Sequence, residues 1–314
     1  LISGWSRSCC SAPARKKLVL KIRSRQCDAS LSEIRRGYAA VSAGCNVLFG
    51  DGRVNLAVTD APIDDATAVV IAVRKIVFTD DNDDRETFEF SPEVTVDLAS
   101  LEGGTVKRLL ENRELAPGRY KSIRFELRND ESTTDSYVDL ADGRRLPLYV
   151  PDDAKSRLTL ATDFSIDERD TIDLTVDFDL RAAVRDGGGD AYEFWPALRW
   201  VRDDDAGSVS GSVAASLIDA SDCVPVVYAY VGKDVTPDDI DEIGVEPLTS
   251  ARVRQNSTNG NGSYTVAFLE AGAYTLALTC DAAVDEPDQS DAIEFIRTRN
   301  FEVKAERTTT LDLN

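Results

Sequence analysis

The stretch Ile172–Leu180, with the sequence IDLTVDFDL, decides the fold class of this chain. Its apolar residues alternate strictly with Asp173, Thr175, Asp177 and Asp179. A period of two places every apolar side chain on one face and every acid on the other, which is the pattern of a half-buried antiparallel strand. The stretch therefore predicts a sheet with one face on a core and the other in water.

Other stretches of the chain follow the same pattern. Residues 123–127 alternate between apolar and charged side chains, and residues 69–78 are rich in β-branched residues. Strands of this kind recur at short intervals with turn residues between them, which favours a β-sandwich over an α/β sheet. The chain is therefore expected to be an all-β protein.

Two local signals refine this prediction. Asp142-Gly143 predicts a tight hairpin between apolar runs, and Pro147 places the second strand of that hairpin at a sheet edge. The strongest helical signal is Thr236-Pro237, an N-cap residue followed by proline at the first helical position.

The chain divides into compositional parts. Residues 1–50 carry a net positive charge, whereas the rest of the chain is strongly acidic. The run Asp203–Gly207 interrupts the apolar pattern and is interpreted as an acidic linker. We therefore expect one sandwich over residues 51–202 and a second over residues 208–314. The motif Leu-x-Pro/Ala-Gly-x-Tyr occurs once in each, at 115–120 and 269–274, and indicates shared turn chemistry.

Small residues precede Cys45 in the N-terminal segment, in the sequence VSAGC. This resembles the cleavage site of bacterial lipoproteins, in which the cysteine carries a lipid. The apolar stretch of a signal peptide is missing before it. Two interpretations stay open: a lipid anchor at Cys45, which would attach the protein peripherally to a membrane, or an unstructured or mistranslated segment over residues 1–50.

Several features of the composition are informative: the absence of His, the net charge and the absence of Met. The chain has no His, which excludes Ser-His-Asp triads, Cys-His dyads and histidine zinc motifs. Its formal net charge of -20 argues against nucleic acid as a partner, because phosphate binding needs a positive face. It has no Met, which indicates a processed or truncated reading frame.

Cys223 and Cys280 each flank a predicted strand of the second sandwich. Two cysteines in an acidic, helix-poor domain predict a disulfide formed in an oxidising compartment. The alternative is a pair of free buried thiols. The bridge would be structural, because no CxxC spacing and no clustered cation is present to activate a thiolate.

Acidic clusters are the remaining candidates for a site. Asp80, Asn82 and Asp84 have the early spacing of a calcium loop, although Arg85 stands where an EF-hand requires glycine. We treat these three residues as a candidate calcium site, calcium being the one cofactor considered. The alternative is a solvated acidic surface that keeps the protein soluble. No pair of carboxylates is singled out for catalysis.

Several segments resemble the DUF4382 family. The sequence VNLAVTDAP at 54–62, followed by VVIAV at 69–73, is similar to the opening of that domain, and PGRY at 117–120, VDFDLR at 176–181 and PALR at 196–199 follow in the family's order. The resemblance covers about residues 53–202. The family occurs in bacterial and archaeal secreted proteins and lipoproteins and has no established function, so the resemblance implies an envelope location and no catalytic residues.

The remainder of the chain is similar to the carboxypeptidase-regulatory, transthyretin-like sandwiches. The strings VSGSV at 209–213, GSYTV at 262–266 and AGAYTL at 271–276 carry this resemblance. It implies a structural or spacer module.

These observations predict a secreted or cell-envelope protein of two tandem immunoglobulin- or transthyretin-like β-sandwiches that is not an enzyme. The leading hypothesis is a surface-anchored binding or adhesion module, with a surface protein or a glycan as its partner. The first alternative is a spacer or assembly subunit that pairs exposed strand edges. The second is an acid-pair hydrolase, which needs a cleft lined by carboxylates of perturbed pKa.

Overall fold

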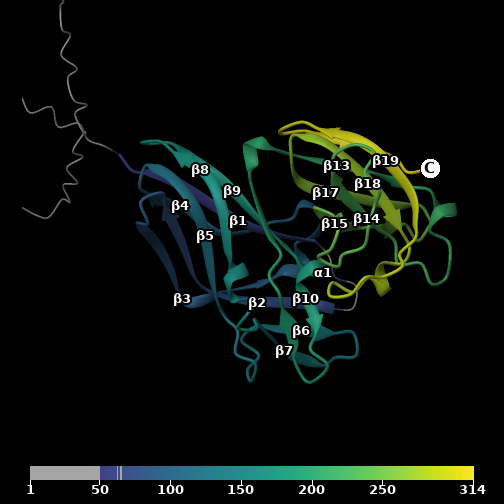
Figure 1. Cartoon of the computed structure of the whole chain (residues 1–314), viewed down its shortest axis with the longest axis horizontal. Coiled ribbons are helices and arrows are strands. Elements are labelled where there is room, and N and C mark those ends of the chain that lie inside the picture. Colours follow the sequence, from purple (N-terminus) through teal and green to yellow (C-terminus); the bar gives the residue numbers. More distant parts are fainter. Residues whose placement is uncertain (1–49, 62, 64–65) are drawn as a thin grey trace, which may run out of the picture. The chain divides into compact units, whose positions relative to one another are not determined.

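The computed structural model describes residues 50–61, 63 and 66–314 of the chain (Figure 1). Nearly all regular structure in this part is β-strand, in four sheets, two built from residues before Asp203 and two from residues after it. The prediction of an all-β protein of two sandwiches is confirmed. Cys45 lies outside the described residues, so the lipid anchor stays a prediction.

The first sandwich consists of a smaller and a larger sheet. The smaller sheet contains, in spatial order, β12 (Leu198–Arg202), β9 (Thr171–Asp179), β1 (Gly52–Ala61) and β4 (Lys107–Leu115). The larger contains β10 (Val184–Asp186), β11 (Tyr192–Phe194), β7 (Arg145–Tyr149), β6 (Tyr137–Leu140), β2 (Ala66–Asp80), β5 (Gly118–Arg128) and β8 (Thr159–Ile166), with β3 (Arg85–Asp97) paired to β2.

A core of apolar side chains fills the space between these two sheets. Phe125 of β5 meets Phe178 of β9 edge-on, with ring centroids 5.2 Å apart, and Phe178 stacks on Phe194. All three rings are at most 1% exposed. Because aromatic side chains bury a large apolar area each, this contact between opposing sheets is a main part of the core.

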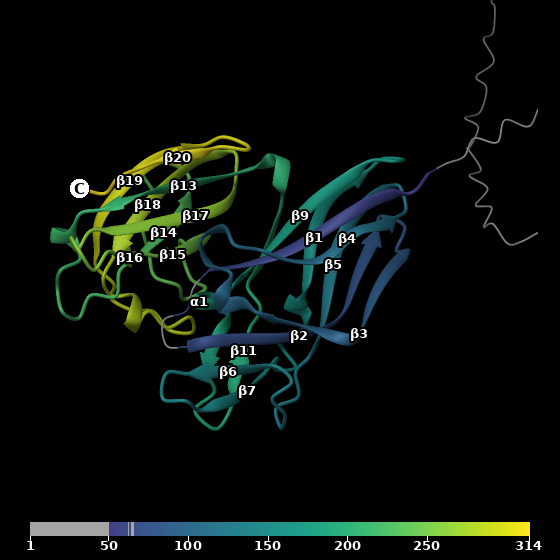
Figure 2. The same cartoon turned by 180° about the vertical axis from the view of Figure 1, so that it is seen from behind.

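The second sandwich follows the same plan with two four-stranded sheets. One contains β16 (Arg254–Gln255), β17 (Gly262–Glu270), β13 (Ala206–Val213) and β20 (Thr308–Thr310). The other contains β15 (Thr249–Arg252), β14 (Val226–Val231), β18 (Gly272–Thr279) and β19 (Phe295–Val303). A separate apolar core lies between them, and the two layers are seen in Figures 1 and 2.

Helical structure in the described residues is limited to single turns. They are α1 (Leu180–Ala183) and the 3-10 turns η1 (Leu98–Ser100), η2 (Glu102–Gly104), η3 (Lys155–Leu158), η4 (Asp203–Asp205), η5 (Ala215–Leu217) and η6 (Ala282–Val284). Within the described ranges, no helix is long and apolar enough to cross a membrane. The prediction of a helix at Thr236 is wrong, because that loop is held open by contacts with other segments, such as Tyr230 Oη donating to the Asp238 carbonyl.

The alternating stretch Ile172–Leu180 forms most of β9, which ends at Asp179, and its apolar side chains are buried as predicted. The strand is antiparallel to β12 but parallel to β1, so the prediction of purely antiparallel pairing is wrong on one side. Its acids do not all face water either, since Asp177 is only 3% exposed. The reason is that Thr249 of the second sandwich covers this part of the strand and donates to Asp177.

The Asp142-Gly143 hairpin is confirmed between β6 and β7. Gly143 has a φ of 87°, and its N–H donates to the Leu140 carbonyl over 3.0 Å. The edge position predicted from Pro147 is wrong, because β7 lies between β6 and β11. Only Leu148 and Tyr149 pair with β11, so the missing N–H of Pro147 removes no hydrogen bond on that side.

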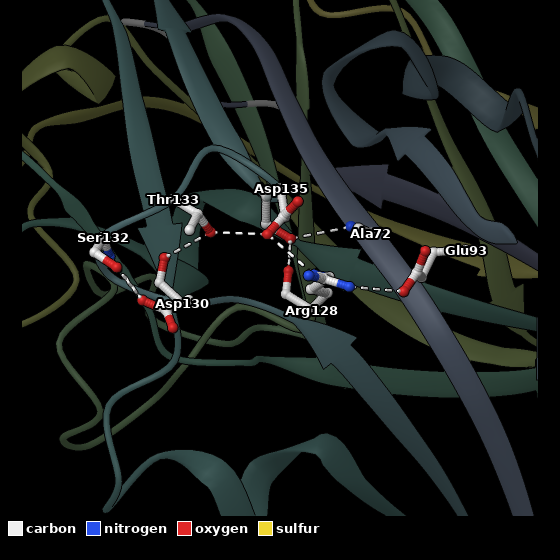
Figure 3. Close-up of polar contacts among 8 residues, drawn as sticks. Ala72, Glu93, Arg128, Asp130, Ser132, Thr133 and Asp135 are labelled. Atoms are coloured by element: carbon white, nitrogen blue, oxygen red, sulfur yellow. Dashed lines mark hydrogen bonds and ion pairs between the residues drawn. The ribbon is translucent and has the colours of Figure 1, made fainter.

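A serine hydroxyl replaces a missing strand partner in the larger sheet. Along β2, the neighbouring strand changes from β6 to β5 near Ala72. The Ala72 N–H donates to Ser136 Oγ over 3.0 Å, and that hydroxyl donates in turn to the Arg128 carbonyl. Figure 3 shows how the Arg128 guanidinium also holds Asp135 and Glu93. The network fixes the loop between β5 and β6 to β2.

The repeated Leu-x-Pro/Ala-Gly-x-Tyr motif has the same structure in both sandwiches. The Tyr120 hydroxyl donates to the Ala116 carbonyl over 2.7 Å, and the Tyr274 hydroxyl donates to the Glu270 carbonyl over 2.8 Å. In each case the tyrosine closes the turn that precedes its own strand. Shared turn chemistry therefore accounts for the motif.

The predicted disulfide between Cys223 and Cys280 is present. It joins residues 57 positions apart, at the start of the segment that leads into β14 and just after β18. The bridge therefore closes a long loop around the core of the second sandwich.

We expect removal of this bridge to destabilise the second sandwich strongly. In the chain-entropy model, closing a loop of this length raises the free energy of the unfolded chain by about 4 kcal/mol, because the bridge lowers its conformational entropy. The double variant Cys223→Ala/Cys280→Ala should unfold at a clearly lower guanidinium concentration than the oxidised protein. Equal midpoints for the two proteins would contradict the expectation.

Candidate functional site

A cavity of about 380 Å³ lies between the two sandwiches. We call it the inter-sandwich cleft. The first sandwich contributes the charged residues Asp60, Glu102, Asp177 and Arg199 to its lining. The second contributes Ser250, Arg252, Arg254 and Tyr264, together with the outward face of β17 at Ser263, Thr265 and Ala267. Its volume is within the ~300–1,000 Å³ typical of small-ligand sites.

The register of the smaller sheet brings three carboxylates together on the side of the first sandwich. Because β1 runs parallel to β9, Asp60 at the end of β1 lies opposite Phe178. Asp177 and Asp179 flank Phe178 in the chain, so both lie close to Asp60. Asp60 Oδ1 accepts a hydrogen bond from the Leu180 N–H over 3.2 Å, which holds the carboxyl group in place.

Asp177 and Arg199 form a buried ion pair across neighbouring strands. The two residues are direct partners in the antiparallel pairing of β9 with β12, and Arg199 Nη2 lies 2.6 Å from Asp177 Oδ2. Arg199 also donates to the carbonyls of Ala267 and Phe268 in the second sandwich. The pair therefore joins the smaller sheet to β17.

A second ion pair closes the other side of the cleft. Arg254 Nη2 lies 2.6 Å from Glu102 Oε2, and Arg252 lies 3.9 Å from the same carboxylate. Glu102 begins the turn η2, in which Gly103 adopts a φ of 67° that favours glycine. The Thr59 hydroxyl donates to the carbonyls on both sides of this turn and fixes it against β1.

The electrostatics of the carboxylate group are unusual. Burial, and then the negative charges of Asp177 and Asp179, raise the pKa of Asp60 well above its usual value of 3.8. Burial and the charge of Asp177 also raise the pKa of Asp179, to about 6. Two carboxyl groups in this region therefore hold their protons more strongly than carboxyl groups in water.

The arrangement is suited to binding a polar molecule. It offers carboxylate acceptors, guanidinium donors and hydroxyl groups that do both, within one cleft. The three acids that line it all belong to the first sandwich: Asp60 and Asp177 lie on adjacent strands of the smaller sheet, and Glu102 lies in the turn η2.

The predicted calcium ligands lie elsewhere. Asp80, Asn82 and Asp84 form the turn between β2 and β3, and none of them lines the cleft. Asp80 Oδ1 accepts hydrogen bonds from the N–H groups of Asn82 and Asp84, both over 2.8 Å. The carboxylate thus stabilises its own turn, and the calcium site stays a prediction.

A different group of acids has the geometry of a metal site. One carboxylate oxygen from each of Asp239, Asp285 and Asp291 lies within 4.8 Å of the others. Each of these residues also holds a loop: Asp285 accepts from the Ile240 N–H and the Tyr228 hydroxyl, and Asp239 accepts from the Asp291 N–H. These hydrogen bonds explain the cluster without a cation.

Sequence reasoning did not single out the cleft. Asp60 is part of the stretch VNLAVTDAP that carries the family resemblance, and Asp177 is expected to face water. The sequence signal that could have found Asp177 is an acid within a strand whose other face is strongly apolar. When a second domain covers the polar face of such a strand, the acid lies at the interface between the domains.

We expect the raised pKa of Asp179 to make stability depend on pH. Between about pH 4 and pH 6 the folded protein holds a proton that the unfolded chain has lost, so stability falls as pH rises through this window. Asp179→Asn removes the charge but keeps an oxygen for the Ala182 N–H at the start of α1. The difference in unfolding free energy between this variant and the native protein should therefore shift in favour of the variant by about 1–3 kcal/mol from pH 4 to pH 8.

Urea denaturation at pH 4 and pH 8 measures this difference. Asp219→Asn, which changes an exposed carboxylate in a loop, is the control and should show no such gain. A difference between Asp179→Asn and the native protein that is the same at both pH values would refute the proposed origin of the effect.

Comparison with known proteins gives one family and several distant structures. No curated protein matches the chain. Among solved structures, the TIE protein of Bacillus anthracis is 9% identical with a TM-score of 0.19, and the alignment covers 83% of this chain but only 33% of that protein. The chain therefore spans about a third of that relative.

Two pilins give similar values. The minor pilin GBS52 of Streptococcus agalactiae is 9% identical, with a TM-score of 0.19 and coverage of 82% of this chain and 94% of the pilin. The major pilin of Streptococcus pyogenes is 11% identical, with a TM-score of 0.18 and coverage of 84% and 97%. TM-scores this low support no inference about function.

The family comparison identifies the first sandwich. Residues 51–196 match the family described as Domain of unknown function (DUF4382). This range contains Asp60, Glu102 and Asp177, which are the three acids of the inter-sandwich cleft. The likeness of residues 208–314 to the carboxypeptidase-regulatory sandwiches stays a prediction. The chain thus carries a DUF4382 domain over residues 51–196.

Proposed function

We propose that this protein is a non-catalytic binding module of the cell envelope or the secreted fraction, and that the inter-sandwich cleft is its ligand site. The observation that carries the proposal is a cleft of about 380 Å³ lined by charged and hydroxyl side chains from both sandwiches. Sites of this kind are the default location of small-ligand binding.

The disulfide supports the location. Disulfides persist in oxidising compartments and are rare in the cytosol of most organisms. The bridge between Cys223 and Cys280 is therefore consistent with export. A lipid anchor at Cys45 would hold such a module at the cell surface, where adhesion requires it.

Further contacts between the two sandwiches favour a rigid site. Arg157 and Arg185 of the first sandwich both bind Glu242 of the second, with Arg157 in a two-pronged contact at 2.7 and 2.9 Å. The buried Arg181 donates to the Ala282 carbonyl. These contacts between the sandwiches supplement the ion pairs inside the cleft. A site held in this way is organised before its ligand arrives, which reduces the entropy lost on binding.

Assembly through strand edges receives less support. The edge strand β19 is long enough to pair with another chain, but Arg297, Arg299 and Glu302 lie along it. Charged residues on an edge strand oppose pairing with a second sheet. We therefore prefer binding over assembly.

A hydrolase with two acids is the second candidate, and one observation favours it. The cleft contains Asp60, a carboxyl group of raised pKa, beside Asp177. Glycoside hydrolysis, however, uses carboxyl groups that flank the scissile bond from two sides. Here Asp60 and Asp177 come from adjacent strands of one wall, which is the geometry of a binding surface.

Blocking the cleft should abolish ligand binding. Thr265→Trp places a large ring on the cleft face of β17, whereas Thr298→Trp puts the same ring on an exposed position of β19 in the opposite sheet. We would screen the full chain by thermal unfolding against neutral sugars, uronic acids, amines and amino acids. A ligand at a hundredfold excess over its Kd stabilises the folded protein by about 2.7 kcal/mol.

We expect at least one class of compound to raise the melting temperature of the native protein and of Thr298→Trp but not that of Thr265→Trp. No response from any class, or an equal response from both variants, contradicts the cleft as the ligand site. If the native protein cleaves an oligosaccharide and Asp60→Asn does not, the protein is a hydrolase and the proposal of a non-catalytic binding module is wrong.

A further inference from the structure

The wall of the inter-sandwich cleft contains buried polar atoms without a partner among the described residues. They are Asp60 Oδ2, Asp177 Oδ1, Arg199 Nε and Ser250 Oγ. All four residues line the cleft, and Asp60, Asp177 and Ser250 are only 6%, 3% and 4% exposed. A buried polar atom without a hydrogen bond is energetically costly, so a ligand that supplies the missing bonds gains affinity here.

These atoms include both acceptors and donors. The Asp177 oxygen accepts hydrogen bonds and the Arg199 Nε–H donates, while the Ser250 hydroxyl and the Asp60 carboxyl in its protonated form do both. A purely cationic ligand would satisfy only the acceptors, and a purely anionic ligand only the donors. The set matches groups that donate and accept at once, as hydroxyls do.

The charges in the cleft lead to the same class of ligand. The acids Asp60, Glu102 and Asp177 are equal in number to the arginines Arg199, Arg252 and Arg254. Asp177 is paired with Arg199, and Glu102 with Arg254, in both cases at 2.6 Å. A strongly charged ligand would compete with one member of each pair for the other, whereas a neutral ligand leaves both pairs intact.

The remainder of the lining is hydroxyl-bearing or weakly apolar. Ser263 and Thr265 on β17 present hydroxyls, and Ala267 and Phe268 present carbon atoms beside them. A ring with hydroxyls at its edge and C–H groups on its faces fits such a surface. A fully apolar ligand would leave the hydroxyls and the buried acids without partners.

On this basis, and resting on the proposed function, we infer that the cleft binds an uncharged sugar ring through its hydroxyl groups. Two sources present this chemistry: a free monosaccharide, and the terminal residue of a longer glycan. The cavity of about 380 Å³ has room for a single ring and part of a second.

Isothermal titration calorimetry on the full chain tests the inference. The neutral probes are glucose, galactose and N-acetylglucosamine with the disaccharides maltose, lactose and chitobiose. The charged probes are glucuronate, putrescine and glycine. We expect at least one neutral sugar to bind and the charged probes not to bind. Tighter binding of a disaccharide than of its monosaccharide assigns the site to a glycan end, and equal binding assigns it to free sugar.

Ser250→Ala supplies the residue-level test. It removes one unpartnered hydroxyl and leaves both ion pairs in place, and we expect the affinity for the sugar to fall about tenfold, which is the loss of about one hydrogen bond. Ser122→Ala, on a strand of the first sandwich outside the cleft, is the matched control and should bind as the native protein does. Unchanged sugar affinity in Ser250→Ala overturns the inference.

The outcomes also separate the inference from the proposed function. If a charged probe binds, loses its affinity in Thr265→Trp and no neutral sugar binds, the ligand class is wrong and the cleft remains a binding site. If no probe binds the native protein, both the inference and the proposed function fail.

Discussion

The buried ion pair between Asp177 and Arg199 is the contact on which the inter-sandwich cleft depends. Asp177 is 3% exposed, so its charge requires a partner, and the pairing of β9 with β12 supplies one directly across the strands. The same guanidinium donates to two carbonyls of β17. Because loss of one member of a buried pair costs roughly 3–5 kcal/mol, this contact fixes the position of β17 against the first sandwich and so defines one side of the cleft.

The remaining features of the cleft follow from that constraint. Burial, and then the negative charges of Asp177 and Asp179, raise the pKa of Asp60, and its Oδ2 has no hydrogen-bond partner among the described residues. Three of the five segments through which the sequence resembles the DUF4382 family, 54–62, 176–181 and 196–199, supply Asp60, Asp177 and Arg199. Residues far apart in the chain thus meet at one place, and the polar atoms that the fold leaves unpaired there are the ones that a ligand can pair.

Much of the fold could be predicted from sequence, because alternation of apolar and polar residues specifies strands and their buried faces. The buried apolar face of Ile172–Leu180, the Asp142-Gly143 hairpin and the disulfide between Cys223 and Cys280 were predicted correctly. The cleft could not be predicted, because alternation says which face of a strand is polar but not whether another domain covers it. Asp177 was expected in water for this reason. The parallel pairing of β1 with β9 was also missed, since it joins strands far apart in sequence.

The central claim is that the cleft between the sandwiches is the ligand site. Two-dimensional amide NMR of the labelled full chain, titrated with the neutral sugar that binds best, tests it most directly. The account predicts that the largest shifts fall on amides that line the cleft, such as those of Gly103, Gly104, Ser250 and Ala267. Shifts confined to residues outside the cleft, for example on β19 or in the turn at Asp80–Asp84, would contradict it.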